Sequence, residues 1–370
     1  MVYSLGVYYI SQHYDIHLQF YQLTKIIMKL LLKGIIIICI IGGCNSNSSQ
    51  KPTSKHYIHV VPDILYENII TQLPHFFMVK DNYLYFQGSE NKDGFLQVID
   101  LKRKEEKYRI GKIGAGPGEF RTPWVHKSVN HGLIIEDVNS SFHAYVNIDS
   151  LFAGKPYMIK PPVKYRLSTR RIGLGENEIL YLAPENQSPL FLDTPDTSFQ
   201  FGTTPFKEEY TNGFSVNQGH IVYNKSKDLV AYATRNYPYI VTYKRKNNEF
   251  FVQNETHWDF NLDYLNGKIK LDDTKRGIHS LALSKDYIIA IQRDYEKDQT
   301  DENTVGWDLS KNPTTLFIYD YNLRFLNVVD LGMPISHLDA NSENNLIYAI
   351  SVKQDYVLVS YDLDLIDLNE

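Results

Sequence analysis

The sequence predicts an all-β fold, namely a six-bladed β-propeller built of four-stranded antiparallel blades. Short runs of β-branched and aromatic residues are separated by clusters of Asn, Asp, Gly and Ser, and the apolar residues recur with a period of two, as in strands. A four-stranded unit recurs at intervals of about fifty residues. Such units cannot bury their apolar faces alone, so we expect them to stack around an axis.

In chain order, the first informative segment is the apolar stretch before Cys44. Two lysines precede a short apolar run that ends in small residues, which is the layout of a secretory signal. The run is too short for a comfortable membrane span. We therefore expect residues 28–43 to be a signal peptide, with residues 1–27 as an over-long start or an atypical n-region. The alternative is a buried apolar strand that ends in a structural cysteine.

The end of this stretch, Ile41-Gly42-Gly43-Cys44, resembles the lipobox of bacterial lipoproteins, in which lipid is attached to the cysteine and cleavage leaves it as the first residue. The resemblance implies a chain anchored to a membrane through Cys44. Because no Asp follows the cysteine, the sorting rules of such lipoproteins imply the outer membrane, with the periplasmic and surface faces both open. The other cysteine, Cys39, lies within the signal, so we expect no disulfide.

The propeller is expected over residues 56–370, after a Ser- and Asn-rich tether at residues 44–55. Within the propeller a strongly apolar strand recurs six times, each copy preceded by a polar turn and an earlier strand. The copies are Tyr83–Phe86, Leu133–Ile135, Ile179–Leu182, Leu229–Tyr232, Tyr287–Ala290 and Leu346–Ala349.

The last unit ends near the end of the chain, and one strand, Tyr57–Val61, is left over at the start. We expect this N-terminal strand to close the last blade by pairing as its outer edge, which would cover two open edges. A β-sandwich or a pair of barrels is the rival fold, but neither explains a repeat at this interval.

A glycine-rich loop, Gly111–Phe120, follows the first unit. A phosphate-binding loop is excluded because no Gly-Lys-Ser/Thr follows, and nearby prolines forbid the helix that would hold the phosphate. Gly114, Gly116 and Gly118 permit positive φ, so we expect that the backbone can turn tightly while Glu119 accepts hydrogen bonds from nearby backbone N–H groups.

Together with the lipobox, this loop resembles that of TolB-like six-bladed propeller lipoproteins of Gram-negative bacteria, an uncharacterised family. The resemblance implies a fold and a compartment but no reaction. The structural interpretation of Gly116, Pro117, Gly118 and Glu119 is a turn between blades, and the functional interpretation is a ligand-binding loop.

Motifs that carry chemistry are sparse. A formal net charge of −5 gives no reason to expect nucleic-acid binding. The segment Gly213–Asn217 lacks the second glycine of a hydrolase elbow, and the histidines show no metal-binding spacing. The sequence therefore predicts no catalytic residue, metal or cofactor.

A ligand is expected around the mouth of the axial channel, on the face where loops join the second to the third strand and one blade to the next. The two longest insertions, Asn254–Gly277 and Arg293–Thr314, map to this face. The candidate ligand-face residues there are Glu119, Arg121, Arg235, Arg276 and Arg293, with Arg170 and Arg171 near an inner strand. The arginines predict an anionic ligand, which the acidic Glu119, Glu136 and Asp137 can oppose. Solvated or structural arginines are the alternative.

From these features we expect a non-enzymatic binding or scaffolding module for a protein, peptide or glycan of the cell envelope. The alternative is a hydrolase or lyase with an acid/base cluster at the channel mouth. It would require two carboxylates, or a histidine and a carboxylate, within hydrogen-bond reach there. A structural subunit of an envelope machine would require a large exposed apolar patch on the blade edges. The sequence leaves the oligomeric state open.

Overall fold

The computed structural model describes residues 57–69, 74–88, 94–129, 132–160, 166, 168, 170–175, 177–247, 249–258, 262–271, 277–294, 311–366 and 368. The chain divides into two compact units, residues 1–48 and 49–370, and the described residues all belong to the second. The expected signal peptide, lipid attachment site and tether lie outside the described residues.

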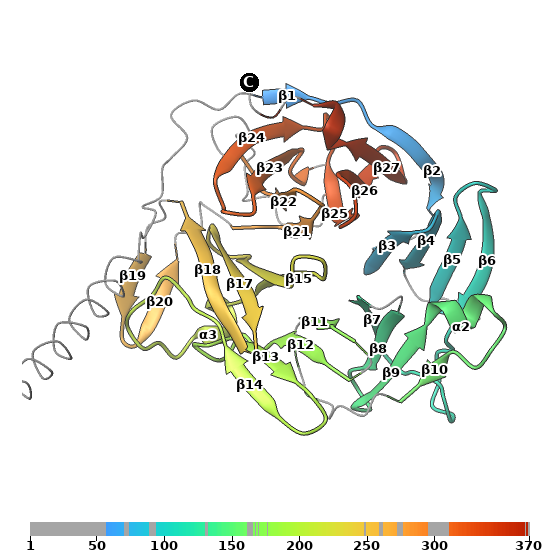
Figure 1. Cartoon of the computed structure of the whole chain (residues 1–370), viewed down its shortest axis with the longest axis horizontal. Coiled ribbons are helices and arrows are strands. Elements are labelled where there is room, and N and C mark those ends of the chain that lie inside the picture. The colour runs from blue at the N-terminus through green and yellow to red at the C-terminus, as the bar shows by residue number, and fades with distance from the viewer. Residues whose placement is uncertain are drawn as a thin grey trace, which may run out of the picture. The chain divides into compact units, whose positions relative to one another are not determined.

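Sets of four antiparallel strands build most of the described unit, and Figure 1 shows them arranged around a common centre. In each set one strand lies nearest that centre, and we call it the first strand of the set. These first strands are β3 (Phe76–Lys80), β7 (Pro123–Ser128), β11 (Arg170–Gly173), β15 (Gly219–Asn224), β21 (Ser280–Leu283) and β25 (Ile335–Ala340).

The second strands contain the strongly apolar runs that the sequence predicts, which confirms those strands. They are β4 (Tyr83–Gln87), β8 (Gly132–Asp137), β12 (Ile179–Leu182), β16 (Leu229–Thr234), β22 (Tyr287–Ile291) and β26 (Leu346–Val352). β8 and β16 are buried at every position, because each lies between two other strands and both its faces are covered. The third strands are β5 (Leu96–Asp100), β9 (Phe142–Asn147), β13 (Leu190–Asp193), β17 (Tyr239–Lys246), β23 (Thr315–Asp320) and β27 (Tyr356–Asp362).

The fourth strands lie antiparallel to the third strands. They are β6 (Glu105–Ile110), β10 (Met158–Ile159), β14 (Ser198–Phe201), β18 (Glu249–His257), β24 (Phe325–Asp330) and, in the last sheet, β2 (Asp63–Ile69). The β7–β10 and β11–β14 sheets are joined into one eight-stranded sheet by a single parallel pair, Ser128 and Gly173.

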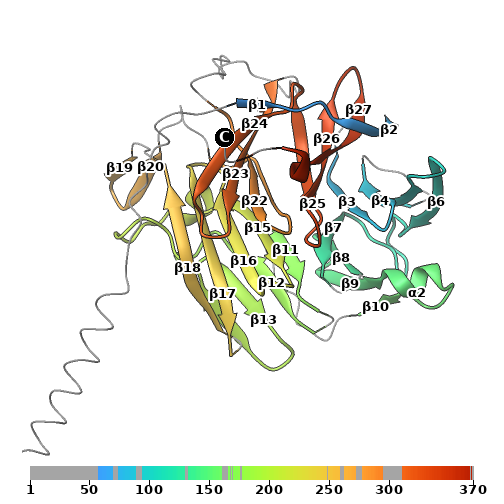
Figure 2. The ribbon, with the colours of Figure 1, turned by 45° about the horizontal axis from the view of Figure 1, so that its top comes forward.

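The first strands contact one another in a closed circuit. β3 contacts β7, and the contacts continue through β11, β15, β21 and β25 back to β3. Apolar clusters fill the space between successive sheets, and Figure 2 shows the β11–β14 and β15–β18 sheets lying face to face. Because the side chains of a strand alternate between its two faces, each sheet contributes to the clusters on both sides. A closed circuit of antiparallel sheets packed in this way is a β-propeller.

The N-terminal strand that completes the last sheet is not the one that the sequence predicts. β1 (Tyr57–His59) instead lies parallel to β24, with Tyr57 opposite Val328. The strand that pairs with β27 is β2, with Asp63 opposite Ser360. An N-terminal strand does form the outer edge of the last sheet, but its predicted position is wrong. Register shifts within β2 break the period-two pattern that would have revealed it.

The predicted insertion Asn254–Gly277 is wrong in its bounds, because β18 continues to His257. A separate hairpin follows, formed by β19 (Leu262–Leu265) and β20 (Lys268–Leu271). The sequence pattern does not predict the short helices α2 (Ile148–Phe152), α3 (Gly213–Val216) and η2 (Leu363–Leu365). Among the described residues, no helix is long and apolar enough to cross a membrane.

Candidate functional site

The candidate functional site lies on the propeller axis, at the end where the first strands begin. Because each sheet is antiparallel, a first strand begins on the face where the second strand ends and where the chain arrives from the preceding sheet. Each first strand carries a ring or a guanidinium group at or next to its first residues. We call these side chains the axial ring: His75, Trp124, Arg170, His220, His279 and His337.

Ring contacts and charges connect the members of the axial ring. The side chains of His75 and Trp124 lie with their ring centroids 6.3 Å apart. Burial lowers the pKa of His337 to about 3, and the charges of His279 and Arg170 contribute. Arg170 is on β11 and His337 is on β25, and these strands are not neighbours in the circuit. The side chains therefore converge on the axis.

His220 and His279, which are half-buried, lie in the same positive field. Burial lowers the pKa of His220 well below its ordinary value, and the charges of Arg170 and Arg235 lower it further. Burial also lowers the pKa of His279 to about 4, with contributions from Arg235 and Arg293. Among the described residues, every charged side chain that shifts these pKa values is basic. The histidines are therefore neutral at pH 7 and act as hydrogen-bonding groups.

Two arginines carry the permanent charge of the site. Arg170, the first residue of β11, is half-buried, and burial together with the charge of Arg235 lowers its pKa. Arg235 is exposed in the turn after β16, where its backbone N–H donates to the carbonyl of Gln218 (2.8 Å). Within the described part of the chain, neither guanidinium group has a hydrogen bond or an ion pair. Two like charges without a carboxylate favour the binding of an anion.

A third axial cation, by contrast, has a carboxylate partner. Lys127 of β7 forms an ion pair with Asp339 of β25, and β3 lies between these two strands in the circuit. Oδ2 of Asp339 also accepts the backbone N–H of Val79 in β3 (3.0 Å). The charge of Lys127 is therefore balanced within the fold.

The structure brings together two of the predicted ligand-face residues. Arg235 and Arg293 lie close enough to lower the pKa of one axial histidine. Arg121 is exposed, and its backbone N–H donates to the buried carboxylate of Asp137 (2.8 Å). Asp137 thus stabilises a turn and does not oppose a ligand. Arg276 lies outside the described residues.

Glu119 is directed into its own loop. Its Oε2 accepts the backbone N–H of Gly116 (2.8 Å), a bond of the kind that the sequence predicts. Of the three loop glycines, which all permit a positive φ, only Gly118 adopts one, at 76°. A Cβ at Gly114 would lie 2.1 Å from Oε2 of Glu119, and one at Gly116 would lie 2.9 Å away. The Glu119 carboxylate therefore packs closely against the backbone at both glycines.

Sequence reasoning missed the histidines and the tryptophan of the axial ring. Each member of the ring precedes the strongly apolar strand of its unit by eight or nine residues, from His75 before Tyr83 to His337 before Leu346. This offset is the signal that could have found them, because a structural repeat places equivalent residues at equivalent positions.

A second polar set lies between the β7–β10 and β11–β14 sheets, and we call it the polar seam. Glu136 forms an ion pair with Arg171, and its Oε1 lies 3.0 Å from Nε2 of His126. The three side chains are 3% to 6% exposed. Burial lowers the pKa of His126, which therefore stays neutral at pH 7. Because this histidine and carboxylate are enclosed between sheets, a substrate cannot reach them.

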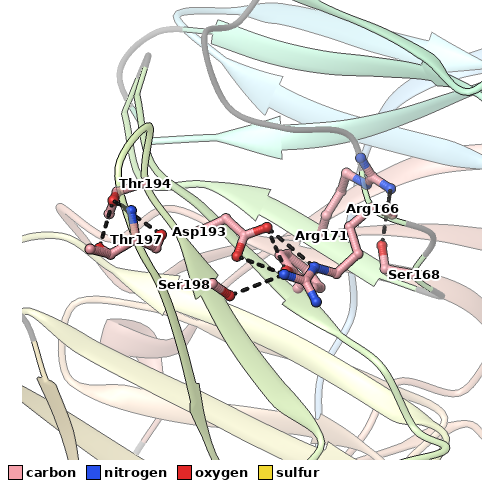
Figure 3. Close-up of polar contacts among 8 residues, drawn as sticks. Arg166, Ser168, Arg171, Asp193, Thr194, Thr197 and Ser198 are labelled. Atoms are coloured by element: carbon pink, nitrogen blue, oxygen red, sulfur yellow. Dashed lines mark hydrogen bonds and ion pairs between the residues drawn. The ribbon is translucent and has the colours of Figure 1, made fainter.

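The polar seam continues along the interface at Arg166 and Asp193 (Figure 3). The guanidinium group of Arg166 contacts the carboxylate of Asp193 at 3.3 Å. It also lies over the rings of Tyr181 and Phe191, at 5.3 and 5.1 Å from their centroids. Nη2 of Arg171 donates to the carbonyl of Arg166 (2.8 Å), which links the two parts. The seam pairs its charges internally, in contrast to the axial ring.

A cavity of about 540 Å³ lies beside β1 and η2, and no member of the axial ring lines it. Its lining includes Tyr57, Asp63 and Tyr361, together with Val61 and Leu365, which are 91% and 85% exposed. It is an open groove at the outer edge of the propeller. Within the described ranges, no group of three His, Cys, Asp or Glu side chains is placed to hold a metal ion.

The fold and the axial ring define a β-propeller with a basic axial site. No protein-family model matches the chain, and no curated protein matches it. A solved structure of a DUF4221 family member from Bacteroides vulgatus is 12% identical, with a TM-score of 0.52 over 81% of this chain and 95% of that one. A "Putative exported protein" from Bacteroides fragilis is 11% identical, with a TM-score of 0.52 over 82% of this chain and 98% of that one. At these identities the likeness shows the fold alone.

Proposed function

We propose that the chain is a six-bladed propeller, anchored to the bacterial outer membrane through Cys44, that binds a ligand at its axial ring without catalysing a reaction. The blade number is supported by the circuit of first strands, each of which begins a four-stranded antiparallel set. The β7–β10 and β11–β14 sets count as two blades because a single residue pair joins them. The glycine-rich loop and the lipobox support a likeness to TolB-like lipoproteins.

The lipid anchor is supported by the sequence around Cys44. The thiol serves anchoring and not the core, so Cys44→Ser should release a folded chain into the soluble fraction. Cys39→Ser is the matched control, because this cysteine lies within the proposed signal. A Cys44→Ser chain that stays membrane-bound in detergent-free fractionation would overturn the anchor. Protease treatment of intact cells distinguishes the periplasmic from the surface face.

The binding function rests on one observation: among the described residues, Arg170 of the axial ring and the nearby Arg235 are two cations without a counter-charge. Arg170 and Arg235 lie close enough for the charge of one to lower the pKa of the other. Unpaired like charges raise the free energy of the free protein, and an anionic ligand removes that cost. The ligand therefore carries acidic groups, on a protein, peptide or glycan of the envelope.

The alternative, a hydrolase or lyase, has less support. General acid–base catalysis needs a titratable pair beside the substrate, and the pair His126–Glu136 is buried in the polar seam together with Arg171. No carboxylate of the described residues shifts the pKa of the axial histidines. For a structural subunit, the exposed Phe251 and Val252 on the edge strand β18 are too few to form a docking patch.

Retention of ligands on the immobilised full chain tests the binding function. The chain should retain acidic ligands from an envelope extract. The double variant Arg170→Gln/Arg235→Gln should retain at least about tenfold less of them, since each lost charge-assisted contact weakens binding. Arg103→Gln is the matched control, because Arg103 is exposed and pairs with Glu105. Equal retention by the double variant and the wild type would refute the function.

A further inference from the structure

The number of uncompensated charges at the axial ring sets the charge of its ligand. Arg170 and Arg235 each carry a permanent charge, and among the described residues neither has a carboxylate partner. Arg293 is not counted among them, because its guanidinium group donates to the carbonyl of Lys311 and has a further interaction within the fold. A monoanion would leave one of the two guanidinium charges uncompensated, whereas a dianion balances both.

The axial histidines place hydrogen-bonding nitrogens around these charges. Nε2 of His220 is buried and has no hydrogen-bond partner within the described residues. Nδ1 of His337 lies 3.2 Å from Oγ of Ser336, which leaves its Nε2 available. A neutral imidazole has one N–H, so each of these rings can donate to an oxygen of an acid group. A buried nitrogen without a partner is costly, and a ligand oxygen would satisfy it.

Trp124 supplies an exposed apolar surface on a strand next to the one that carries Arg170. This residue is 41% exposed, although its side chain is large and apolar. It lies on β7, whose neighbour in the circuit is β11, the strand that carries Arg170. The ring of His75 is tilted against it at 41°. A ligand that contacts both parts of the site needs a flat or apolar portion next to its acid groups.

We propose that the axial ring binds a dianion joined to a flat ring, with the acid oxygens between Arg170 and Arg235 and the flat ring against Trp124. This inference rests on the proposed function and deepens it by naming the charge and the shape of the bound group. Phosphate monoesters and dicarboxylates share this chemistry, and both form charge-assisted hydrogen bonds with arginine.

Isothermal titration calorimetry of the full chain at pH 7.5 tests this proposal with four probes. Phenyl phosphate and phthalate are dianions with a ring, benzoate is a monoanion with a ring, and inorganic phosphate lacks the ring. At least one of the two ring dianions should bind at least about tenfold more tightly than benzoate does, and at least about tenfold more tightly than inorganic phosphate does. This is the effect expected from one charge-assisted contact.

Three variants assign the contacts. Arg235→Gln should weaken the binding of the ring dianion by at least about tenfold. This variant should stay folded, because Arg235 is exposed. Arg170→Gln should weaken binding to the same extent. Trp124→Ala should weaken the binding of phenyl phosphate while leaving the affinity for inorganic phosphate unchanged. Arg103→Gln should bind every probe as the wild type does.

The outcomes separate this proposal from the proposed function. Tight binding of only one ring dianion supports the proposal and identifies the acid group. If benzoate bound as tightly as the dianions and its binding were lost in Arg235→Gln, the preference for a dianion would be refuted, while the anion-binding function would stand. If neither ring dianion bound, but the double arginine variant still failed to retain ligands from the extract, only the proposal of a ring dianion would be refuted. No probe binding together with unchanged retention of extract ligands would refute both.

Discussion

The two faces of the β11–β14 sheet are packed in opposite ways. Toward β15–β18, Leu180 and its neighbours join a large apolar cluster that includes Tyr232. Toward β7–β10, the same strands present Arg171, Tyr181 and Asp193, which belong to the polar seam. The alternation along a strand fixes which residues share a face, but it does not fix whether that face is apolar.

Backbone contacts hold the polar seam, where the apolar cluster is small. The oxygen of Gly173 accepts the backbone N–H of Val129 (2.9 Å) and the hydroxyl of Ser128 (3.2 Å). A Cβ at position 173 would lie 2.5 Å from Oγ of Ser128, so glycine permits this approach. The apolar cluster of this interface consists of Ile134, Tyr145, Ile179 and Tyr181, with Phe191 packed against it. The two faces of the sheet therefore predict different responses to substitution.

Removing one partner of the buried ion pair gives the largest expected effect. Glu136→Ala leaves Arg171 buried without its carboxylate, so the free energy of unfolding should fall by about 3–5 kcal/mol. The double variant Glu136→Met/Arg171→Met buries no charge and should be about as stable as the wild type. Urea denaturation measures both. A single variant as stable as the double variant would contradict the role of the pair.

A cavity in the apolar interface gives the next largest effect. Leu180 is fully buried, and Leu180→Ala should lower the free energy of unfolding by about 2–5 kcal/mol through lost burial and an unfilled cavity. Ile159→Ala is the control, because Ile159 is 43% exposed and should change stability by about 0.5 kcal/mol at most. Equal stability of the two variants would show that this interface is not closely packed.

Acidification should weaken the fold through the axial histidines. The folded-state pKa is about 4 for His279 and about 3 for His337, whereas both titrate near 6.5 when unfolded. As the pH falls from 6.5 to 4, the unfolded chain binds more protons, so stability is lost. In the double variant His279→Gln/His337→Gln, the free energy of unfolding should fall less over this pH range than in the wild type. The difference should be on the order of 2 kcal/mol for each histidine replaced. Urea denaturation across this pH range measures the difference. If the free energy of unfolding of the double variant depended on pH as that of the wild type does, the lowered pKa values of these histidines would be contradicted.

The smallest effect is expected where the cations have no partner. Arg170→Gln/Arg235→Gln removes two charges that repel each other, so the free energy of unfolding should stay within about 0.5 kcal/mol or rise slightly. This outcome would contrast with Glu136→Ala, in which a paired charge is left alone. A loss larger than about 2 kcal/mol would mean that these arginines serve the fold.

The repeat can be predicted because each unit meets a local requirement. The runs at Tyr83–Phe86 and Leu346–Ala349 lie in β4 and β26, since a strand covered on both faces needs continuous apolar residues. β2 could not be predicted from its own residues, because its pairing with β27 joins the two ends of the described chain and includes register shifts.

The candidate site was only partly predictable. The loop positions of Arg235 and Arg293 indicate the correct face, because hairpin geometry fixes where such turns lie. The convergence of Arg170 and His337 depends on the closure of the circuit, which no local pattern encodes. Glu136 maps near the same face, yet its side chain turns into the polar seam, and the sequence gives no signal of that choice.

Anion binding at the axial ring is the central claim, and anomalous diffraction from crystals soaked in selenate tests it most directly. Selenate is a dianion with the tetrahedral shape of phosphate, and its selenium atom can be located without bias. The account predicts an anomalous peak between the guanidinium groups of Arg170 and Arg235, which disappears in the Arg170→Gln/Arg235→Gln variant. Peaks confined to other surface arginines, with no density at the axial ring, would contradict it.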